Sequence, residues 1–286
     1  MRKKIPIIIV SLLFLSGLGL VFYPMISNWY MQRHQGQVVA EYDEEAAKLS
    51  QQKIDEEMKK AVEYNKSLLG NVVLTDPFDA EALEEQNQEY DDLLNVGKDG
   101  VMASVEIPSI DVYLPVYHTT ESDVLEKGTG HLQNSSLPVG GTGTHAVISG
   151  HTALPSAKMF DNLTELELGD VFYVHVLNET LAYEINQIKV VLPTDISDLL
   201  INKNEDYVTL VTCTPYGINS HRLLVRGTRI PYVEKEKDAE SAKAAAKQNH
   251  NWHAYYAAAI VAVVLVMIGT IFYRRNKRKS RKSYEE

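Results

Sequence analysis

The single cysteine of this 286-residue chain is the residue best suited to covalent chemistry. Cys213 follows a strand-like run at residues 207–212 (YVTLVT) and precedes turn-forming residues at 214–217 (TPYG). Strand ends that face loops are where a rigid scaffold presents reactive groups, so one interpretation of Cys213 is a thiolate nucleophile. The other is a buried structural cysteine, which is a common fate of a free thiol. Position alone leaves both open.

A cysteine nucleophile needs a base, and the usual base is a histidine. Of the nine histidines, His151 directly follows a second strand-like run at residues 144–150 (THAVISG). Two strands that each end in a reactive group can bring those groups together at one end of a sheet. The other histidines flank apolar segments, lie in or beside loops or fall within a strand pattern, and those in the loops lack the spacing of a metal site.

Arg222 begins a third strand-like run, residues 222–229 (RLLVRGTR), whose alternation places residues 222, 224 and 226 on one face. A guanidinium beside a thiolate stabilises that anion, or holds the oxyanion of a tetrahedral intermediate. The alternative is a solvated arginine on an edge strand, which we expect for at least one arginine of this run.

Composition narrows the class of protein. The formal net charge is −10 and 45% of the residues are hydrophobic, as in ordinary folded proteins. One cysteine excludes an intramolecular disulfide framework and a cysteine-rich metal site. The glycine-rich run at 140–144 (GGTGT) lacks the lysine of a phosphate loop, and no EF-hand pattern is present. We therefore expect no metal and no cofactor.

Two runs, residues 5–23 and 254–273, contain no Asp, Glu, Lys, Arg or His. Each is close to the roughly 20 apolar residues that cross a bilayer. Basic residues precede the first run and follow the second, in the tail 274–286, so both ends are expected in the cytoplasm and residues 24–253 outside. This outer segment holds 18 basic and 36 acidic residues, which argues against nucleic-acid binding. The sequence predicts a cell-membrane protein with an extracytoplasmic domain.

Each apolar run has an alternative interpretation. Residues 5–23 resemble a cleaved signal peptide in their basic start, but the run is long and no clear small-x-small cleavage site follows. Residues 254–273 could form a buried core helix, which their length and the basic stop signal disfavour.

Between these runs the pattern changes from helical to β. A helical region is expected at 36–95, with a long amphipathic helix over 36–69, a loop at 75–79 and an acidic helical stretch at 79–95. Strand candidates then lie at 101–107, 111–117, 144–149, 171–177, 181–192, 206–212 and 222–230. Seven or eight short strands predict a mainly β domain over 101–232, a closed barrel or a sandwich. Residues 233–253 are a polar, partly helical linker.

Several of these motifs resemble one enzyme family. Residues 209–213 (TLVTC) match the TLxTC signature of sortases, an arginine follows nine residues later at Arg222, and His151 comes before both. The order histidine, cysteine, arginine is that of the family, whereas papain-like proteases place cysteine before histidine. Residues 107–117 and 214–222 resemble the first barrel strands and the post-cysteine segment of the class C, pilus-assembling sortases, and Asp76, Pro77 and Phe78 match their lid motif.

This resemblance implies a closed β-barrel of about eight strands, preceded by N-terminal helices and a lid loop. It implies a transpeptidase on the outer face of a Gram-positive cell, and we expect the enzyme to be a monomer. Such enzymes cleave an LPxTG-like signal between Thr and Gly through a thioacyl intermediate. Class C members then transfer the acyl group to a lysine amine of the next pilin. By the same resemblance Cys213 is the nucleophile, His151 the general acid and base, and Arg222 the residue that orients substrate and stabilises the oxyanion. Thr209, Leu210 and Thr212 are the implied substrate-binding residues.

The lid motif also suggests a mechanism from its residue types. Asp76 can pair with Arg222 while Phe78 covers the sulfur of Cys213, and Pro77 restricts the turn between them. The alternative is an ordinary turn before a helix, in which Asp76 is only a helix cap.

Three other functions remain to be distinguished. A cysteine hydrolase with the same three residues would release a free acid, and a cell-wall-anchoring sortase would transfer to a different amine. A membrane-tethered adhesin or scaffold would keep its function when Cys213 is replaced by Ala.

Overall fold

The computed structural model describes residues 5–70, 74–79, 87–234 and 237, and of residues 5–15 the helical backbone only. The predicted C-terminal span and tail, residues 254–286, lie outside the described residues, as does most of the predicted linker at 233–253. Among the described residues, no helix is long and apolar enough to cross a membrane. The prediction that residues 5–23 cross one stays a prediction.

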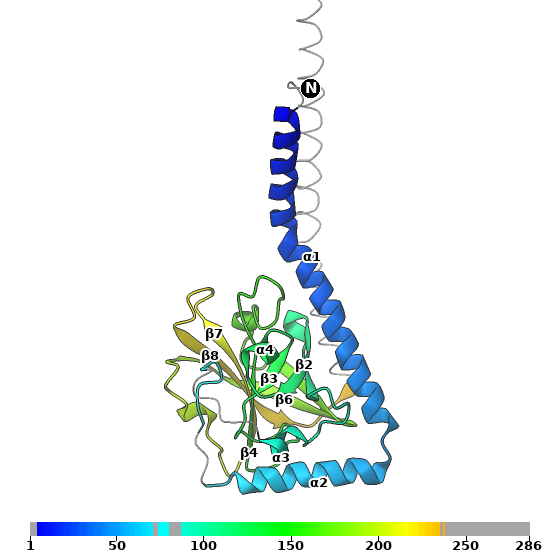
Figure 1. The fold of residues 1–286 in the computed structure, drawn as a ribbon. Helices are drawn as coiled ribbons and strands as arrows, with labels where there is room; N and C mark the ends of the chain where they lie inside the picture. The colour runs from blue at the N-terminus through cyan, green and yellow to red at the C-terminus, as the bar shows by residue number, and fades with distance from the viewer. Residues whose placement is uncertain (1–4, 71–73, 80–86, 235–236, 238–286) are drawn as a thin grey trace, which may run out of the picture. The chain divides into compact units, whose positions relative to one another are not determined.

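Eight strands close into a barrel in the order β1-β2-β3-β4-β7-β8-β6-β5 (Figure 1). Two neighbouring pairs, β2 with β3 and β4 with β7, are parallel, and the other pairs are antiparallel. The closed barrel confirms the predicted mainly β fold. The strands are β1 (Val101–Ile107), β2 (Val112–His118), β3 (Thr129–His131), β4 (Thr144–Ser149), β5 (Val171–Val176), β6 (Glu179–Val191), β7 (Asp206–Thr214) and β8 (His221–Ile230).

The barrel interior explains the alternation in the sequence. Ile148, Leu210 and Val225 lie in register across β4, β7 and β8, and each is fully buried. Successive side chains of a strand point to opposite faces, so the same strands present different residues to the outer surface. This shared interior fixes the register, because a slip of one residue would turn each strand's apolar set outward.

Short helical elements connect the strands. These are α3 (Gln88–Asp91), α4 (Ser122–Leu125) and the 3₁₀ turns η1 (Pro108–Ile110), η2 (Leu163–Glu165) and η3 (Ser197–Leu199). The predicted acidic helix at 79–95 is reduced, among the described residues, to the single turn of α3. The side chain of Asn87 caps that turn by accepting from the backbone N–H groups of Glu89 and Tyr90.

Two long helices precede the barrel, α1 (Ile5–Lys48) and α2 (Gln51–Ser67). The predicted single helix over 36–69 is therefore wrong. Ser50 interrupts it: its backbone is extended and its hydroxyl accepts from the N–H of Lys53, so it starts a new helix. Tyr42 joins α1 to the barrel, because its buried hydroxyl donates to the Met102 carbonyl at 2.8 Å and accepts from the Leu177 N–H at 2.9 Å.

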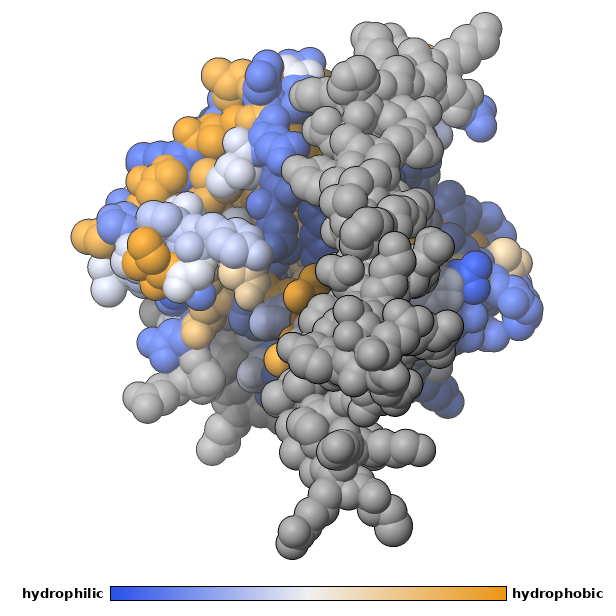
Figure 2. All heavy atoms as spheres, turned by 90° about the horizontal axis from the view of Figure 1, so that it is seen from above, coloured by the Kyte–Doolittle hydropathy of each residue, from blue (hydrophilic) through white to orange (hydrophobic). Residues whose placement is uncertain are grey.

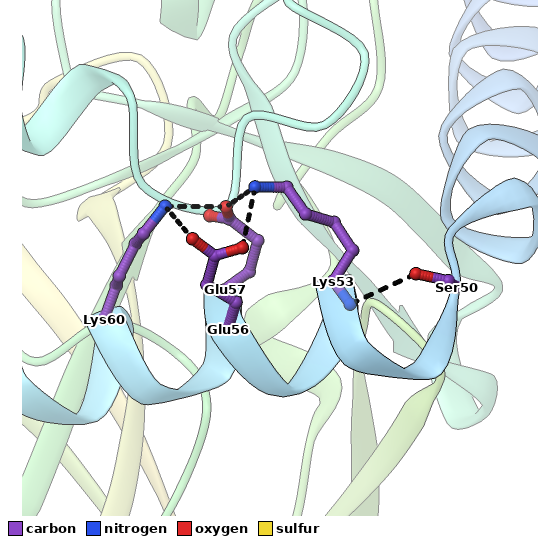
Figure 3. A network of polar contacts seen from close by, with 5 residues as sticks. All are labelled: Ser50, Lys53, Glu56, Glu57 and Lys60. Atoms are coloured by element: carbon purple, nitrogen blue, oxygen red, sulfur yellow. Dashed lines mark hydrogen bonds and ion pairs between the residues drawn. The ribbon is translucent and has the colours of Figure 1, made fainter.

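Figure 3 shows the polar network along α2, in which Lys53 and Lys60 reach the carboxylates of Glu56 and Glu57. Pairs at this helical spacing each add only a few tenths of a kcal/mol, about 0.2–0.5. The firmer attachment lies near the end of α2. Buried Asn65 donates to the Leu137 carbonyl at 3.1 Å and accepts from the Leu137 N–H at 2.7 Å. The chain that follows α2 therefore starts from a fixed point on the barrel.

Candidate active site

The barrel topology brings the two predicted reactive groups to one end of the sheet. Strands β4 and β7 are parallel neighbours, with Ser149 opposite Val211, so their carboxyl ends lie together. His151 follows the first of these ends and Cys213 lies at the second. Strand β8 runs back antiparallel to β7, which places Arg222 directly opposite Cys213 in the ladder. Residues separated by up to 71 positions are thus assembled by strand order alone.

Gly150 and Thr212 join the two strand ends. The Thr212 hydroxyl donates to the Gly150 carbonyl at 2.7 Å, and the Gly150 N–H donates to the Val211 carbonyl at 3.0 Å. A Cβ atom at residue 150 would lie 2.8 Å from the Phe160 ring, so glycine is required by space. These bonds hold the residue before His151 against the residue before Cys213.

His151 is half-buried at the start of a long loop. Its carbonyl accepts from the Phe160 N–H at 3.0 Å, and the carboxylate of Asp161 accepts from the N–H groups of Ala153 and Met159. The loop is therefore folded back beside the histidine. Burial lowers the pKa of the His151 imidazole, and the charge of Glu126 opposes that change in part.

Cys213 is 7% exposed. Burial is the main cause that raises the pKa of its thiol, the positive charge of Arg222 opposes this and the negative charge of Asp76 adds to it. Since the pKa of Cys213 is raised and the pKa of His151 is lowered, this arrangement favours a neutral thiol and a neutral imidazole at pH 7.

Asp76 is bound to Arg222 in this structure. The guanidinium Nε donates to Asp76 Oδ1 at 2.8 Å and a terminal nitrogen donates to Oδ2 at 2.5 Å, while the other terminal nitrogen donates to the Asn219 carbonyl at 3.0 Å. Both side chains are only 11% exposed. Two parallel bonds of this kind fix the orientation of both groups. The arginine opposite Cys213 is therefore occupied by a carboxylate of the same chain.

The ring of Phe78 lies near His151 and Arg222. Its centroid is 5.7 Å from that of the His151 ring, and the guanidinium carbon of Arg222 lies 5.1 Å from it. Phe78 and Leu74 also pack on a second apolar cluster outside the barrel interior. Other members of this cluster are Leu132, Val147, Val191, Ile196, Leu199, Val211 and Leu224. Residues 74–79, hereafter the lid segment, are thus held by apolar packing as well as by the Asp76 ion pair.

The three residues implied as substrate-binding are inside the protein. Thr209, Leu210 and Thr212 are 1%, 0% and 2% exposed. The Thr209 hydroxyl lies 2.7 Å from Nε2 of His145, and Leu210 belongs to the barrel core. The structure therefore shows them positioning the strand that carries Cys213, and their predicted contact with substrate stays a prediction.

Sequence reasoning missed three features of this site. These are the Thr212–Gly150 bond, the charge of Glu126 near His151 and the apolar packing of Leu74. Each depends on residues distant in the sequence, which no sequence spacing reveals. An available signal was the apolar residue Leu74 just before the lid motif. In the part of the chain that the structure describes, no group of three or more His, Cys, Asp or Glu residues could hold a metal ion.

Fold and site together define a closed β-barrel that presents a cysteine, a histidine and an arginine at one end. The sequence matches the family model described as the sortase domain over residues 105–230. Among solved structures, sortase C-1 from Streptococcus pneumoniae is 54% identical with a TM-score of 0.65, covering 69% of this chain and 100% of that one. Sortase C-1 from Actinomyces oris is 49% identical with a TM-score of 0.59, covering 63% and 99%. This chain belongs to the sortase family.

Curated relatives are more distant. Sortase D of Bacillus subtilis is 32% identical over 129 residues, which are 44% of this chain and 62% of that protein. Sortase A of Listeria monocytogenes is 25% identical over 216 residues, 74% of this chain and 84% of that protein. The chain thus spans less than two thirds of the length of the first of these relatives.

Proposed function

We propose that this sortase is a membrane-anchored cysteine transpeptidase that cleaves LPxTG-like signals and joins pilin subunits through a lysine amine. The observation that carries the proposal is the pairing of Cys213 with Arg222 across β7 and β8, beside the strand end that leads to His151. One group can attack a carbonyl, one can hold the resulting oxyanion and one can transfer protons. Together they supply the parts of acyl transfer.

The first half-reaction forms a thioester. The Cys213 thiolate attacks the carbonyl between Thr and Gly of the signal, and the Arg222 guanidinium stabilises the oxyanion of the tetrahedral intermediate. As the intermediate collapses, His151 as imidazolium gives its proton to the departing glycine amine. The thiol proton is first taken up by the imidazole, so the proton count balances.

The second half-reaction passes the acyl group to an amine. His151, now neutral, accepts a proton from the incoming lysine amine as that nitrogen attacks the thioester carbonyl. The intermediate then expels the Cys213 thiolate, and an amide bond remains. Water competes for the same thioester, so selection of the amine depends on positioning and on exclusion of water.

The lid segment holds the resting enzyme closed in this proposal. The Asp76 carboxylate is hydrogen-bonded to the guanidinium that must bind the substrate carbonyl, and the Phe78 ring lies beside His151. Substrate or a partner protein must displace both. The neutral state favoured for Cys213 and His151 in this arrangement agrees with an enzyme that is inactive while closed.

The sequence and the relatives support a proposed location and partner. The charge-free runs with basic flanks support anchoring in the cell membrane with residues 24–253 on the extracytoplasmic face. One solved relative is described as a pilus-related sortase C of Group B Streptococcus, at 41% identity and a TM-score of 0.62, covering 68% of this chain and 97% of that one. We therefore propose pilin subunits with an acceptor lysine as partners, and a monomeric enzyme without cofactor.

A transfer assay in detergent with the full chain tests the proposed reaction. An LPxTG-type peptide is mixed with a pilin-derived lysine peptide, and the products are weighed by mass spectrometry. We expect an amide-linked product with the parent chain, and none with Cys213→Ala, His151→Gln or Arg222→Ala. Arg226→Ala is the matched control on the same strand, because its side chain stacks on Tyr207 and bonds Asn186.

Each of the other outcomes indicates one of the alternative functions. Free acid in abundant lysine peptide indicates a hydrolase. Product with a cell-wall peptide amine but not with the pilin peptide indicates a cell-wall-anchoring sortase. Full function of Cys213→Ala would leave only a scaffold.

A further inference from the structure

The part of α1 around residues 27 and 28 is hydrogen-bonded to the loop that follows His151. The Ser27 hydroxyl donates to the Ser156 carbonyl at 2.9 Å, and the Lys158 N–H donates to Asn28 Oδ1 at 2.7 Å. These partners are about 130 residues apart in the chain, and Figure 1 shows the two segments side by side. The same loop is closed onto His151 by the Phe160 N–H bond. A direct chain of contacts therefore links α1 to the candidate active site.

The turn between β7 and β8 belongs to the same end of the barrel. It follows Cys213, and burial together with the charge of Asp161 in the His151 loop raises the pKa of Tyr216 in this turn. Tyr216 and Ile218 are 67% and 70% exposed. Large side chains thus project outward from the turn that follows Cys213. Figure 2 looks onto this end and shows apolar residues beside hydrophilic ones where grey residues leave the face visible.

The apolar run at residues 5–23 ends very close to this contact. Ser27 and Asn28 lie four and five residues beyond Tyr23 in one continuous helix, about 6–8 Å along its axis. The polar headgroup layer on each side of a bilayer is about 5–8 Å thick. If residues 5–23 span the hydrocarbon, the bonds to Ser156 and Lys158 form at headgroup level, and a tilted helix brings them closer still.

Charge supports the same placement. The segments 24–40, 151–160 and 215–222 contain no Asp or Glu. Together these three segments hold 35 residues. In the predicted outer segment, residues 24–253, 36 of 230 residues are acidic, so about five acidic residues would be expected among 35. Lys158 and Arg33 lie in these segments, and so does Arg222, whose charge is paired with Asp76. A surface that meets anionic phosphate groups is favoured by few carboxylates, and these three segments contribute none, although Asp161 adjoins the second of them.

Exposed aromatic residues of α1 directly follow Ser27 and Asn28 along the helix. Trp29 and Tyr30 are 57% and 62% exposed, and the guanidinium of Arg33 lies 4.9 Å from the Trp29 ring. Tryptophan and tyrosine are enriched where a protein meets the headgroup layer, because one part of each side chain is apolar and the other is wet.

We propose that α1 holds the active-site end of the barrel against the membrane surface, with residues 153–158 and 216–218 at the lipid headgroups. The inference rests on the membrane anchoring proposed above. An enzyme held in this way has its active site close to the lipid headgroups. It therefore favours polypeptide substrates that are themselves tethered to that membrane.

Depth-dependent quenching in vesicles tests this orientation. The full chain carries Cys213→Ala, so that one introduced cysteine takes an environment-sensitive fluorophore, at Ile218→Cys or at Lys203→Cys. Lys203 is an exposed residue before β7, at the end of the barrel opposite Cys213. The vesicles contain phosphatidylcholine, phosphatidylglycerol and phosphatidylcholine spin-labelled at its headgroup. We expect the label at 218 to lose most of its fluorescence and the label at 203 to lose little.

Equal quenching at the two positions, or stronger quenching at 203, would overturn the orientation. Flotation of the same vesicles tests the anchor separately: a chain that does not float overturns the anchoring and the orientation together, while the detergent transfer assay still reports on the reaction. Adding Ser27→Ala and Asn28→Ala should reduce the difference between the two labels. An unchanged difference would show that these two bonds do not hold the barrel in place.

Discussion

The Arg222 guanidinium donates two hydrogen bonds to the Asp76 carboxylate, across 146 residues of sequence. Arg222 is also the ladder partner of Cys213, so one cation connects the lid segment to the thiol. Its positive charge opposes the rise in the pKa of Cys213, whereas the charge of Asp76 contributes to that rise. In the proposed mechanism, displacement of residues 74–79 therefore also changes the ionisation of the thiol.

Breaking this pair should make Cys213 more reactive. Hydrogen bonds to charged groups contribute about 1.5–3 kcal/mol, so we expect Asp76→Ala to raise the rate of labelling by a small thiol reagent roughly tenfold to a hundredfold. Phe78→Ala should act in the same direction through lost packing. Asp55→Ala, at an exposed site on α2, is the matched control and should label at the parent rate. Parent-like labelling of both lid variants would rule out a closed lid segment.

The same pair should set the pH dependence of labelling. Only the thiolate reacts, so the midpoint of rate against pH reports the pKa of Cys213. Asp76→Asn removes a nearby negative charge, which lowers that pKa and moves the midpoint to lower pH. Arg222→Ala removes a positive charge, which raises the pKa and moves the midpoint to higher pH. Midpoints are compared by labelling across a pH series, and shifts in the same direction for both variants would contradict this account.

Much of the fold could be predicted from local pattern. Alternating apolar residues and turn residues located seven of the eight strands, because each strand has one face inside the barrel. Strand β3, only three residues long, has no alternation to detect and exists through its neighbours β2 and β4. The helix over 36–69 was predicted as one piece because apolar spacing continues across Ser50, while the cap that divides it is a single hydroxyl.

The candidate active site, like the fold, has some residues that local sequence pattern predicts and some contacts that it does not. Cys213, His151 and Arg222 could be identified because each lies at the end of a strand-like run and the signature around Cys213 is specific. The bonds from Ser27 and Asn28 to the His151 loop carry no local signal. They depend on the path of a helix over the barrel, which the sequence of either segment alone does not determine.

Tyr42 provides a test of how firmly α1 is attached. Tyr42→Phe removes a hydroxyl that serves a buried carbonyl of β1 and the N–H of Leu177. A buried group left without a partner costs about 1–3 kcal/mol, so we expect the free energy of unfolding to fall by that amount. Urea denaturation measures it. Tyr30→Phe, at an exposed position on the same helix, should leave stability unchanged, and equal losses in both variants would show that the hydroxyl of Tyr42 has no special role.

Thr212 offers a test of the link between the two strand ends. Thr212→Val keeps the shape of the side chain but removes the hydroxyl that donates to the Gly150 carbonyl, so His151 and Cys213 should lose their fixed spacing. Small displacements of reacting groups are costly, and we expect kcat/KM for peptide transfer to fall on the order of tenfold to a hundredfold. The fall should lie in kcat, because the bond positions the reacting groups.

Thr212→Ser separates this positioning role from a general loss of packing. Serine restores the hydroxyl but lacks the methyl group, so it should recover most of the activity even though it packs less well. The midpoint of thiol labelling against pH should stay near the parent value in both variants, because neither changes a charge near Cys213. If Thr212→Ser is as impaired as Thr212→Val, the methyl group rather than the hydroxyl holds the strand end, and the bond to Gly150 does not position the site.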